Sequence, residues 1–136
     1  MDPVQPGKAA QRAGWGLSGI AIAFFAMDGA IKLFAQAEVA KASAPLGWPA
    51  DPATIYMLAA LLLGSALLYA IPRTAVLGAI LLTGYLGGAV ATHVRVGSPL
   101  LTHALFGVYL GIIVWGGLWF RDPRLRALLP LKTQGE

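Results

Sequence analysis

Two apolar segments joined by a proline turn decide the fold of this chain, and residues 54–94 read TIYMLAALLLGSALLYAIPRTAVLGAILLTGYLGGAVATHV. Arg73 is the only Lys, Arg, Asp or Glu in these residues. A helix that spans a membrane needs about 20 mostly apolar residues, and each half of the stretch supplies them. Proline disfavours helical geometry in the residue before it and suits the first turn of a helix. The sequence around Pro72 therefore predicts a tight turn between two antiparallel helices.

Two further apolar segments flank this hairpin. None of the four segments alternates strictly between polar and apolar residues, which argues against membrane-spanning strands. We predict an all-α integral membrane protein, a four-helix bundle of antiparallel up-down topology formed by one transmembrane domain, residues 1–136. The predicted helices are residues 13–34, 54–71, 74–94 and 100–120. Residues 35–53 form a longer loop on the outer side, and residues 121–136 form a basic C-terminal tail.

The composition supports a membrane protein. Hydrophobic residues make up 57% of the 136 residues and charged residues 12%, whereas a soluble domain usually has about 25% charged residues. The chain has no cysteine, which excludes disulfides and thiolate metal sites. Its net charge of +4 does not indicate nucleic-acid binding, because no basic stripe is interleaved with aromatic residues.

The distribution of positive charge predicts the orientation in the membrane, because loops on the cytoplasmic side carry an excess of Lys and Arg. Four spans put both termini and the turn at residues 72–73 on one side, with seven cations, against three on the other side. We therefore predict that both termini are cytoplasmic. The seven cations on the side of the termini are Lys8, Arg12, Arg73, Arg121, Arg124, Arg126 and Lys132. The three on the other side are Lys32, Lys41 and Arg95.

Five ionisable residues fall at one level of the predicted bundle. A rise of about 1.5 Å per residue places them about 24 to 33 Å from the cytoplasmic boundary of an apolar slab about 30 Å thick. Ionisable groups at membrane depth are costly and are candidates for function. Three predicted helices contribute them: Asp28, Lys32, His93, Arg95 and His103.

The roles of these residues remain open from the sequence. Asp28 and Lys32 are spaced i, i+4, so they form either a structural ion pair or part of a polar pocket. In the second interpretation Asp28, His93 and His103 are candidate catalytic residues, because a carboxylate and an imidazole suit acid–base chemistry. The candidate ligand-binding residues are Lys32, Tyr85, Thr92 and Arg95.

Tyr85 also has two interpretations. Its hydroxyl either donates into the pocket or packs on a neighbouring carbonyl. The two histidines lack the spacing of known metal motifs, so we predict no metal site. No cofactor is predicted; haem is disfavoured, and a quinone is a candidate ligand. Gly107 and Gly111 form a G-x-x-x-G pair, which favours either close packing within the chain or a homodimer.

Several stretches resemble the DoxX-like branch of the DoxX family of small four-helix membrane proteins, over roughly residues 15–131. They are MDGAIK at 27–32, IPRTAVLGAILLTGYLGGAVATHVR at 71–95, HALFGVYLG at 103–111 and WGGLWFRDPRLRALLPL at 115–131. The resemblance implies a four-helix bundle in a bacterial inner membrane. The wider family includes subunits associated with thiosulfate-to-quinone oxidation and with redox-stress assemblies.

Two functions follow as hypotheses. The first is an accessory membrane subunit linked to redox processes that binds a lipophilic molecule, a quinone or a lipid, as well as membrane lipids. The alternative is a small membrane enzyme in which Asp28 and His93 or His103 act on a lipophilic substrate. A transporter is less favoured, because the predicted inner half of the bundle has almost no polar groups.

Overall fold

The computed structural model describes residues 6–132, and these form helices without any strand. Short 3₁₀ turns and one π-helical turn connect the α-helices. In chain order the elements are α1 Lys8–Phe34, α2 Gln36–Ser43, η1 Ala44–Leu46, α3 Pro52–Ala70, η2 Pro72–Thr74, α4 Ala75–Arg95, η3 Leu100–Ala104, α5 Phe106–Arg121 and α6 Pro123–Leu128.

The prediction of an all-α membrane protein with four spanning helices is confirmed. Four helical segments among the described residues are long and apolar enough to cross a membrane. In each of them, no more than 33% of the apolar window is buried inside the molecule. The remaining apolar surface needs an apolar solvent, which a lipid bilayer supplies. The segments are Lys8–Phe34, Pro52–Ala70, Pro72–Arg95 and Leu100–Arg121.

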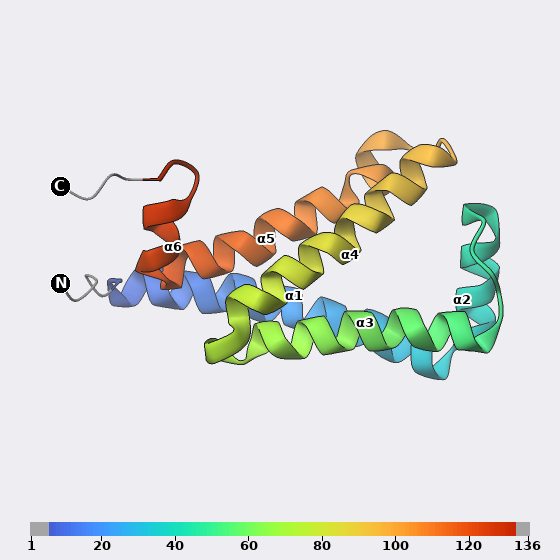
Figure 1. The fold of residues 1–136 in the computed structure, drawn as a ribbon, viewed down its shortest axis with the longest axis horizontal. Coiled ribbons are helices and arrows are strands. Elements are labelled where there is room, and N and C mark those ends of the chain that lie inside the picture. Colours follow the sequence, from blue (N-terminus) through green and yellow to red (C-terminus); the bar gives the residue numbers. More distant parts are fainter. Residues whose placement is uncertain (1–5, 133–136) are drawn as a thin grey trace.

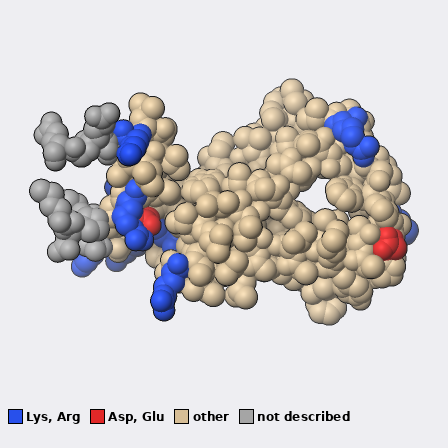
Figure 2. Space-filling view, viewed as in Figure 1, with Lys and Arg blue, Asp and Glu red and all other residues tan. Residues whose placement is uncertain are grey.

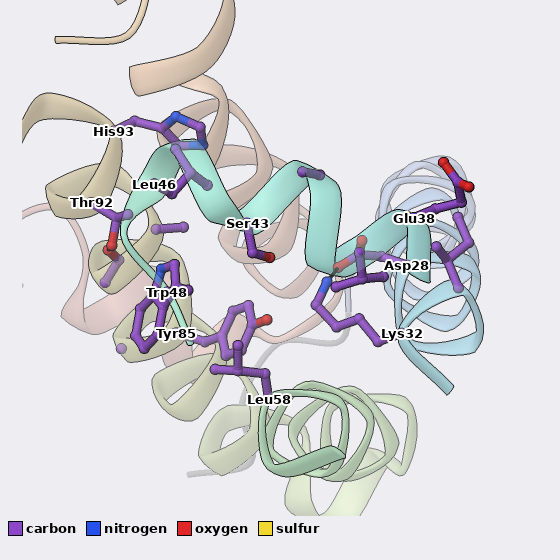
Figure 3. Close-up of a pocket in the computed structure, with 16 residues that line it drawn as sticks. Asp28, Lys32, Glu38, Ser43, Leu46, Trp48, Leu58, Tyr85, Thr92 and His93 are labelled. Carbon is purple, nitrogen blue, oxygen red and sulfur yellow. Dashed lines mark hydrogen bonds and ion pairs between the residues drawn. The ribbon is translucent and has the colours of Figure 1, made fainter. Parts of the chain in front are cut away.

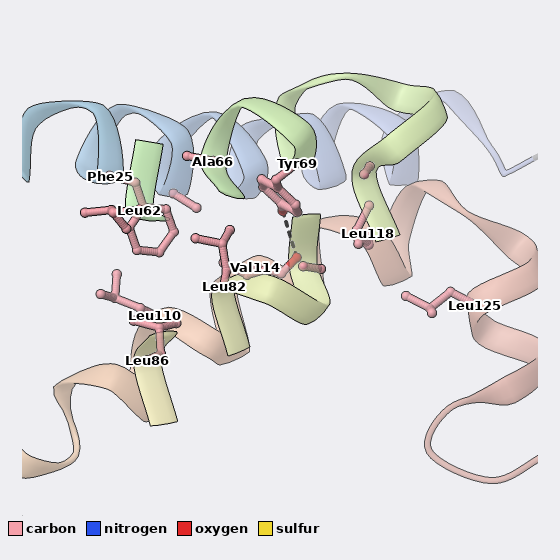
Figure 4. Packing of buried hydrophobic residues seen from close by; sticks show 13 residues of the cluster. Phe25, Leu62, Ala66, Tyr69, Leu82, Leu86, Leu110, Val114, Leu118 and Leu125 are labelled. Atoms are coloured by element: carbon pink, nitrogen blue, oxygen red, sulfur yellow. Dashed lines mark hydrogen bonds between the residues drawn. The ribbon is translucent and has the colours of Figure 1, made fainter. Parts of the chain in front are cut away.

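The four long helices pack as a ring around one hydrophobic core. Helix α1 packs on α3 and α5, and α4 packs on the same two helices from the opposite side. Figure 4 shows the buried cluster at their centre. Its largest members include Phe25, Leu62, Tyr69, Leu82 and Leu118. Each helix therefore supplies part of one continuous core.

Small residues permit the closest approaches in this ring. A side chain at Gly78 would collide with the backbone of Tyr69, so the α3–α4 hairpin depends on the missing Cβ. A Cβ at Gly107 would lie 2.8 Å from Val90 Cγ2, so Gly107 is used in packing α5 on α4. Gly111 has open space around it. Gly107 therefore serves close packing within the chain, whereas a homodimer stays a prediction.

The bundle is tight at one end and open at the other. Figure 1 shows α4 and α5 diverging from α1 and α3 along the long axis, away from the end where α1 begins. Helix α2 lies across the open end, because the chain turns sharply at Ala35. The space-filling view in Figure 2 is hollowed between these elements. This open end holds the candidate site.

The fourth span differs from the regular helix predicted for residues 100–120. Its first turn is π-helical, with bonds from the Ala104 and Leu105 amides to the carbonyls five residues earlier. A regular helix resumes at Phe106. The wider turn follows directly after Pro99, whose ring restricts the backbone angle φ where the chain enters the turn.

Candidate functional site

A cavity of about 590 Å³ lies at the open end of the bundle. Helices α1, α2 and α4 form most of its wall, with contributions from η1, the loop after it and α3 (Figure 3). Five of the seven candidate residues line it: Asp28, Lys32, Tyr85, Thr92 and His93. Asp28 and Lys32 on α1 thus share one space with His93 on α4, as the sequence predicts, whereas Arg95 and His103 of the same predicted level do not line it.

An ion pair stands at one end of the cavity. Lys32 Nζ donates to Asp28 Oδ2 over 2.5 Å, one helical turn apart on α1. The Lys32 side chain is only 14% exposed and that of Asp28 36%. Because a buried ammonium is costly without a partner, Asp28 neutralises Lys32 and holds it beside the cavity.

Tyr85 points across the cavity from α4. In Figure 3 its hydroxyl faces the Asp28–Lys32 pair. Among residues 6–132 this hydroxyl has no hydrogen-bond partner, so the carbonyl contact considered from the sequence is not found there. A half-buried phenol without a partner can donate to a ligand in the cavity.

The rest of the wall is mostly apolar. Trp48 lies on the loop after η1, and Leu46, Leu58, Ile31 and Val39 complete the surface around it. Trp48 was not predicted as a site residue, although its place in the predicted outer loop was a signal. Glu38 on α2 is a further acidic lining residue, and it pairs loosely with the exposed Lys41 at 3.6 Å.

The two histidines lie together at the other end. Their ring centroids are 5.9 Å apart in an edge-on arrangement. His93 Nδ1 is 2.9 Å from Ser98 Oγ, whereas His103 Nδ1 is 2.8 Å from Thr102 Oγ1. Only His93 lines the cavity; His103 is exposed outside it.

Thr92 and Arg95 have structural contacts. Thr92 donates to the Gly88 carbonyl of its own helix at 2.8 Å. Arg95 does not line the cavity, but its Nη2 donates to the Leu46 carbonyl at 2.9 Å and so ties η1 to the end of α4. Over the described part of the chain, no three His, Cys, Asp or Glu side chains come together as a metal-binding group.

The fold and the cavity define a helical multi-pass membrane protein with a mostly apolar pocket that holds a few polar groups near one end of its bundle. The sequence model of the DoxX-like family matches residues 16–117, and the chain belongs to that family. This match confirms the resemblance found in the sequence. No curated protein and no solved structure shows a significant similarity to the chain.

Proposed function

We propose that this protein binds a lipophilic molecule with a hydrogen-bond-accepting head, best represented by a quinone, as an accessory subunit of a membrane redox process. The observation that carries the proposal is the Tyr85 hydroxyl, which has no hydrogen-bond partner among residues 6–132 and lies beside the Asp28–Lys32 pair in a mostly apolar cavity. A quinone carbonyl would accept from Tyr85, and its ring would pack on the apolar wall.

The size of the cavity suits such a ligand. Sites for small organic molecules usually occupy about 300 to 1,000 Å³ and combine an apolar wall with a few polar groups. The cavity here is about 590 Å³. Trp48 and Leu58 provide flat and branched apolar surface for the ring of the ligand.

The charged residues that line the cavity favour a ligand with a neutral head over one with a phosphate head. Asp28 and Glu38 both line the cavity, and Lys32 is already neutralised by Asp28. An anionic headgroup would therefore meet no unpaired Lys or Arg among the lining residues, whereas a quinone carbonyl needs only a donor. Of the two ligand classes expected from the sequence, the lining charges thus favour a quinone over a lipid with an anionic headgroup.

The enzyme alternative has less support. Asp28 is paired with Lys32, and His93 is hydrogen-bonded to Ser98. Figure 3 draws Asp28 and His93 at opposite ends of the cavity. An acid–base pair acting on one bond would need both groups at the reacting atoms. The alternative gains if Asp28→Asn abolishes a chemical conversion and retains binding.

We further propose that the cavity faces the periplasmic side of a bacterial inner membrane, with both termini cytoplasmic. Figure 2 shows Lys and Arg gathered at the end where α1 begins. Seven cations at that end against three at the cavity end support this orientation by the positive-inside rule.

Titration of the full-length protein in nanodiscs with a short-chain benzoquinone tests the proposal, with tryptophan fluorescence as the readout. Tyr85→Phe should weaken binding about tenfold, because it removes one hydrogen bond to the ligand. Tyr56→Phe, at an exposed tyrosine outside the cavity, is the matched control. Trp48→Phe should remove the quenched part of the signal. Equal affinity in wild type and Tyr85→Phe would contradict the proposed role of this hydroxyl.

A further inference from the structure

A second cavity, about 660 Å³, lies at the opposite end of the molecule. It is formed by the start of α1, the η2 turn and the junction of α5 with α6. Three arginines line it, Arg73, Arg121 and Arg124, together with Trp15. Arg73 lies 48 positions before Arg121 and 51 before Arg124, so the fold brings it to the other two.

Arg121 lacks an anionic partner within the part of the chain that the structure describes. Its Nη2 donates to the neutral Ser18 Oγ at 3.0 Å, and its guanidinium carbon lies 3.9 Å from the centre of the Trp15 ring. Its Nε is buried without a hydrogen-bond partner. Within residues 6–132 no carboxylate forms an ion pair with it. A half-buried cation in this state attracts an anion from outside the chain.

The acidic residue of this cavity is already engaged. Asp122 accepts from the Arg124 backbone amide at 2.9 Å as the N-cap of α6, and from the Arg124 side chain at 3.3 Å. Arg73 is exposed, and no hydrogen bond or ion pair to it is found among the described residues. Among the described residues, Arg73 and Arg121 therefore leave the cavity with a positive charge that no carboxylate compensates.

We propose that this cavity binds the phosphate group of an anionic membrane lipid. Guanidinium groups match phosphate oxygens in geometry and charge. The cavity lies where the apolar helices end, which is the headgroup level of a bilayer, and Val76, Leu77 and Leu118 extend its wall toward the apolar region. A phosphate attached to acyl chains uses both surfaces, whereas a free phosphate uses only the arginines.

The arginine cavity differs from the proposed quinone site in its place in the fold and in its charge. The family match ends at residue 117, so Arg121 and Arg124 lie beyond the matched residues. The positive charge of the run from Arg121 to Arg126 alone would give only diffuse attraction to headgroups. The cavity adds Arg73 and a defined pocket.

Native mass spectrometry of the full-length protein in mild detergent measures the binding. Phosphatidylglycerol, phosphatidylcholine and inorganic phosphate are the three probes. The wild type should retain phosphatidylglycerol in preference to phosphatidylcholine, and inorganic phosphate alone should bind far more weakly. Arg73→Gln and Arg121→Gln should each lower phosphatidylglycerol binding about tenfold, because each removes a charge-assisted contact.

Arg12→Gln is the matched control, because it removes the same charge at the same end from an exposed residue outside the cavity. Arg73→Gln keeps the test valid if Arg121→Gln fails to fold, since the Arg73 side chain is exposed. Three results would overturn the proposal: equal binding of the two lipids, an equal loss in Arg12→Gln and Arg73→Gln, or phosphate binding as tight as lipid binding.

Discussion

The side chain of Arg95, the last residue of α4, donates a hydrogen bond from Nη2 to the carbonyl oxygen of Leu46, with 2.9 Å between the atoms. The contact bridges 49 positions of sequence. Leu46 lines the cavity, and Gly47 beside it has φ +80°. A Cβ at Gly47 would lie 2.9 Å from Arg95 Nη2. Glycine at position 47 permits the left-handed backbone and leaves room for the Arg95 guanidinium.

Removing this contact should loosen the segment that crosses the cavity. Arg95→Gln is expected to increase amide hydrogen exchange in residues 36–48 about fivefold, because one hydrogen bond no longer holds η1 to α4. Hydrogen–deuterium exchange with mass spectrometry measures the effect. Arg12→Gln, at the other end of the molecule, should leave this segment unchanged. Identical exchange in Arg95→Gln and wild type would show that the contact does not restrain α2 and η1.

Neighbouring glycines on α5 should respond differently to the same substitution. A Cβ on Gly117 would collide with Ser18 Oγ on α1, so Gly117→Ala should destabilise the fold by about 1–3 kcal/mol. Gly116→Ala is the control, because its Cβ would make an ordinary contact 3.6 Å from Leu17 Cδ1. Thermal unfolding in detergent compares the two. Equal Tm values would mean that α1 and α5 separate easily at this point.

A directed chain of hydrogen bonds crosses the tight end of the bundle. Tyr69 donates its single hydroxyl proton to the Val114 carbonyl at 2.7 Å, so Ser18 must donate to the Tyr69 oxygen, also at 2.7 Å. Arg121 in turn donates to Ser18. Figure 4 shows the link from Tyr69 to Val114 inside the core.

Tyr69→Phe should therefore destabilise the protein by about 1–3 kcal/mol, because it leaves a buried hydroxyl and a buried carbonyl without their partner. Tyr109→Phe is the matched control: its hydroxyl donates to the Leu101 carbonyl at 2.9 Å, but the residue is 41% exposed. Chemical unfolding in mixed micelles gives both values. A loss in Tyr109→Phe as large as that in Tyr69→Phe would contradict a role for burial.

The start of α3 should weaken at acid pH. Asp51 caps this helix, and hydrogen bonds from the Thr54 hydroxyl and backbone amide lower the pKa of Asp51 from its ordinary 3.8. Because the folded-state pKa is the lower one, the stabilisation is complete above the ordinary value and is lost as pH falls through the lowered value. Tm measured between pH 5 and pH 2 should fall less steeply in Asp51→Asn, whose neutral amide oxygen still caps. Equal slopes would rule out this cap as a contributor.

Much of the fold was predictable because its causes are local. The length and apolarity of four segments predict the spans, and Pro72 predicts the turn between α3 and α4. The i, i+4 spacing likewise predicts that Asp28 and Lys32 share a helix face, where they form their ion pair. The π-helical turn after Pro99 was not predicted, because nothing in the residues distinguishes it from a regular first turn.

The candidate site was predictable only as a level in the membrane. Counting residues along each helix gives depth, and it predicted one level for Asp28, Lys32 and His93, which do line one cavity. The count of residues does not say how each helix is rotated about its own axis relative to the others. That rotation places His93 in the cavity and His103 outside it, and it leaves the Tyr85 hydroxyl facing the ion pair.

Composition and residue spacing were thus sufficient for the apolar helices that can span a membrane and for their number, since each helix depends on one segment at a time. Helix splay, the Arg95 contact to η1 and the arginine cavity depend on side chains far apart in the chain. Arg121 meets Ser18 across 103 positions, for example. Such contacts arise from how helix surfaces fit together, and no single segment carries that information.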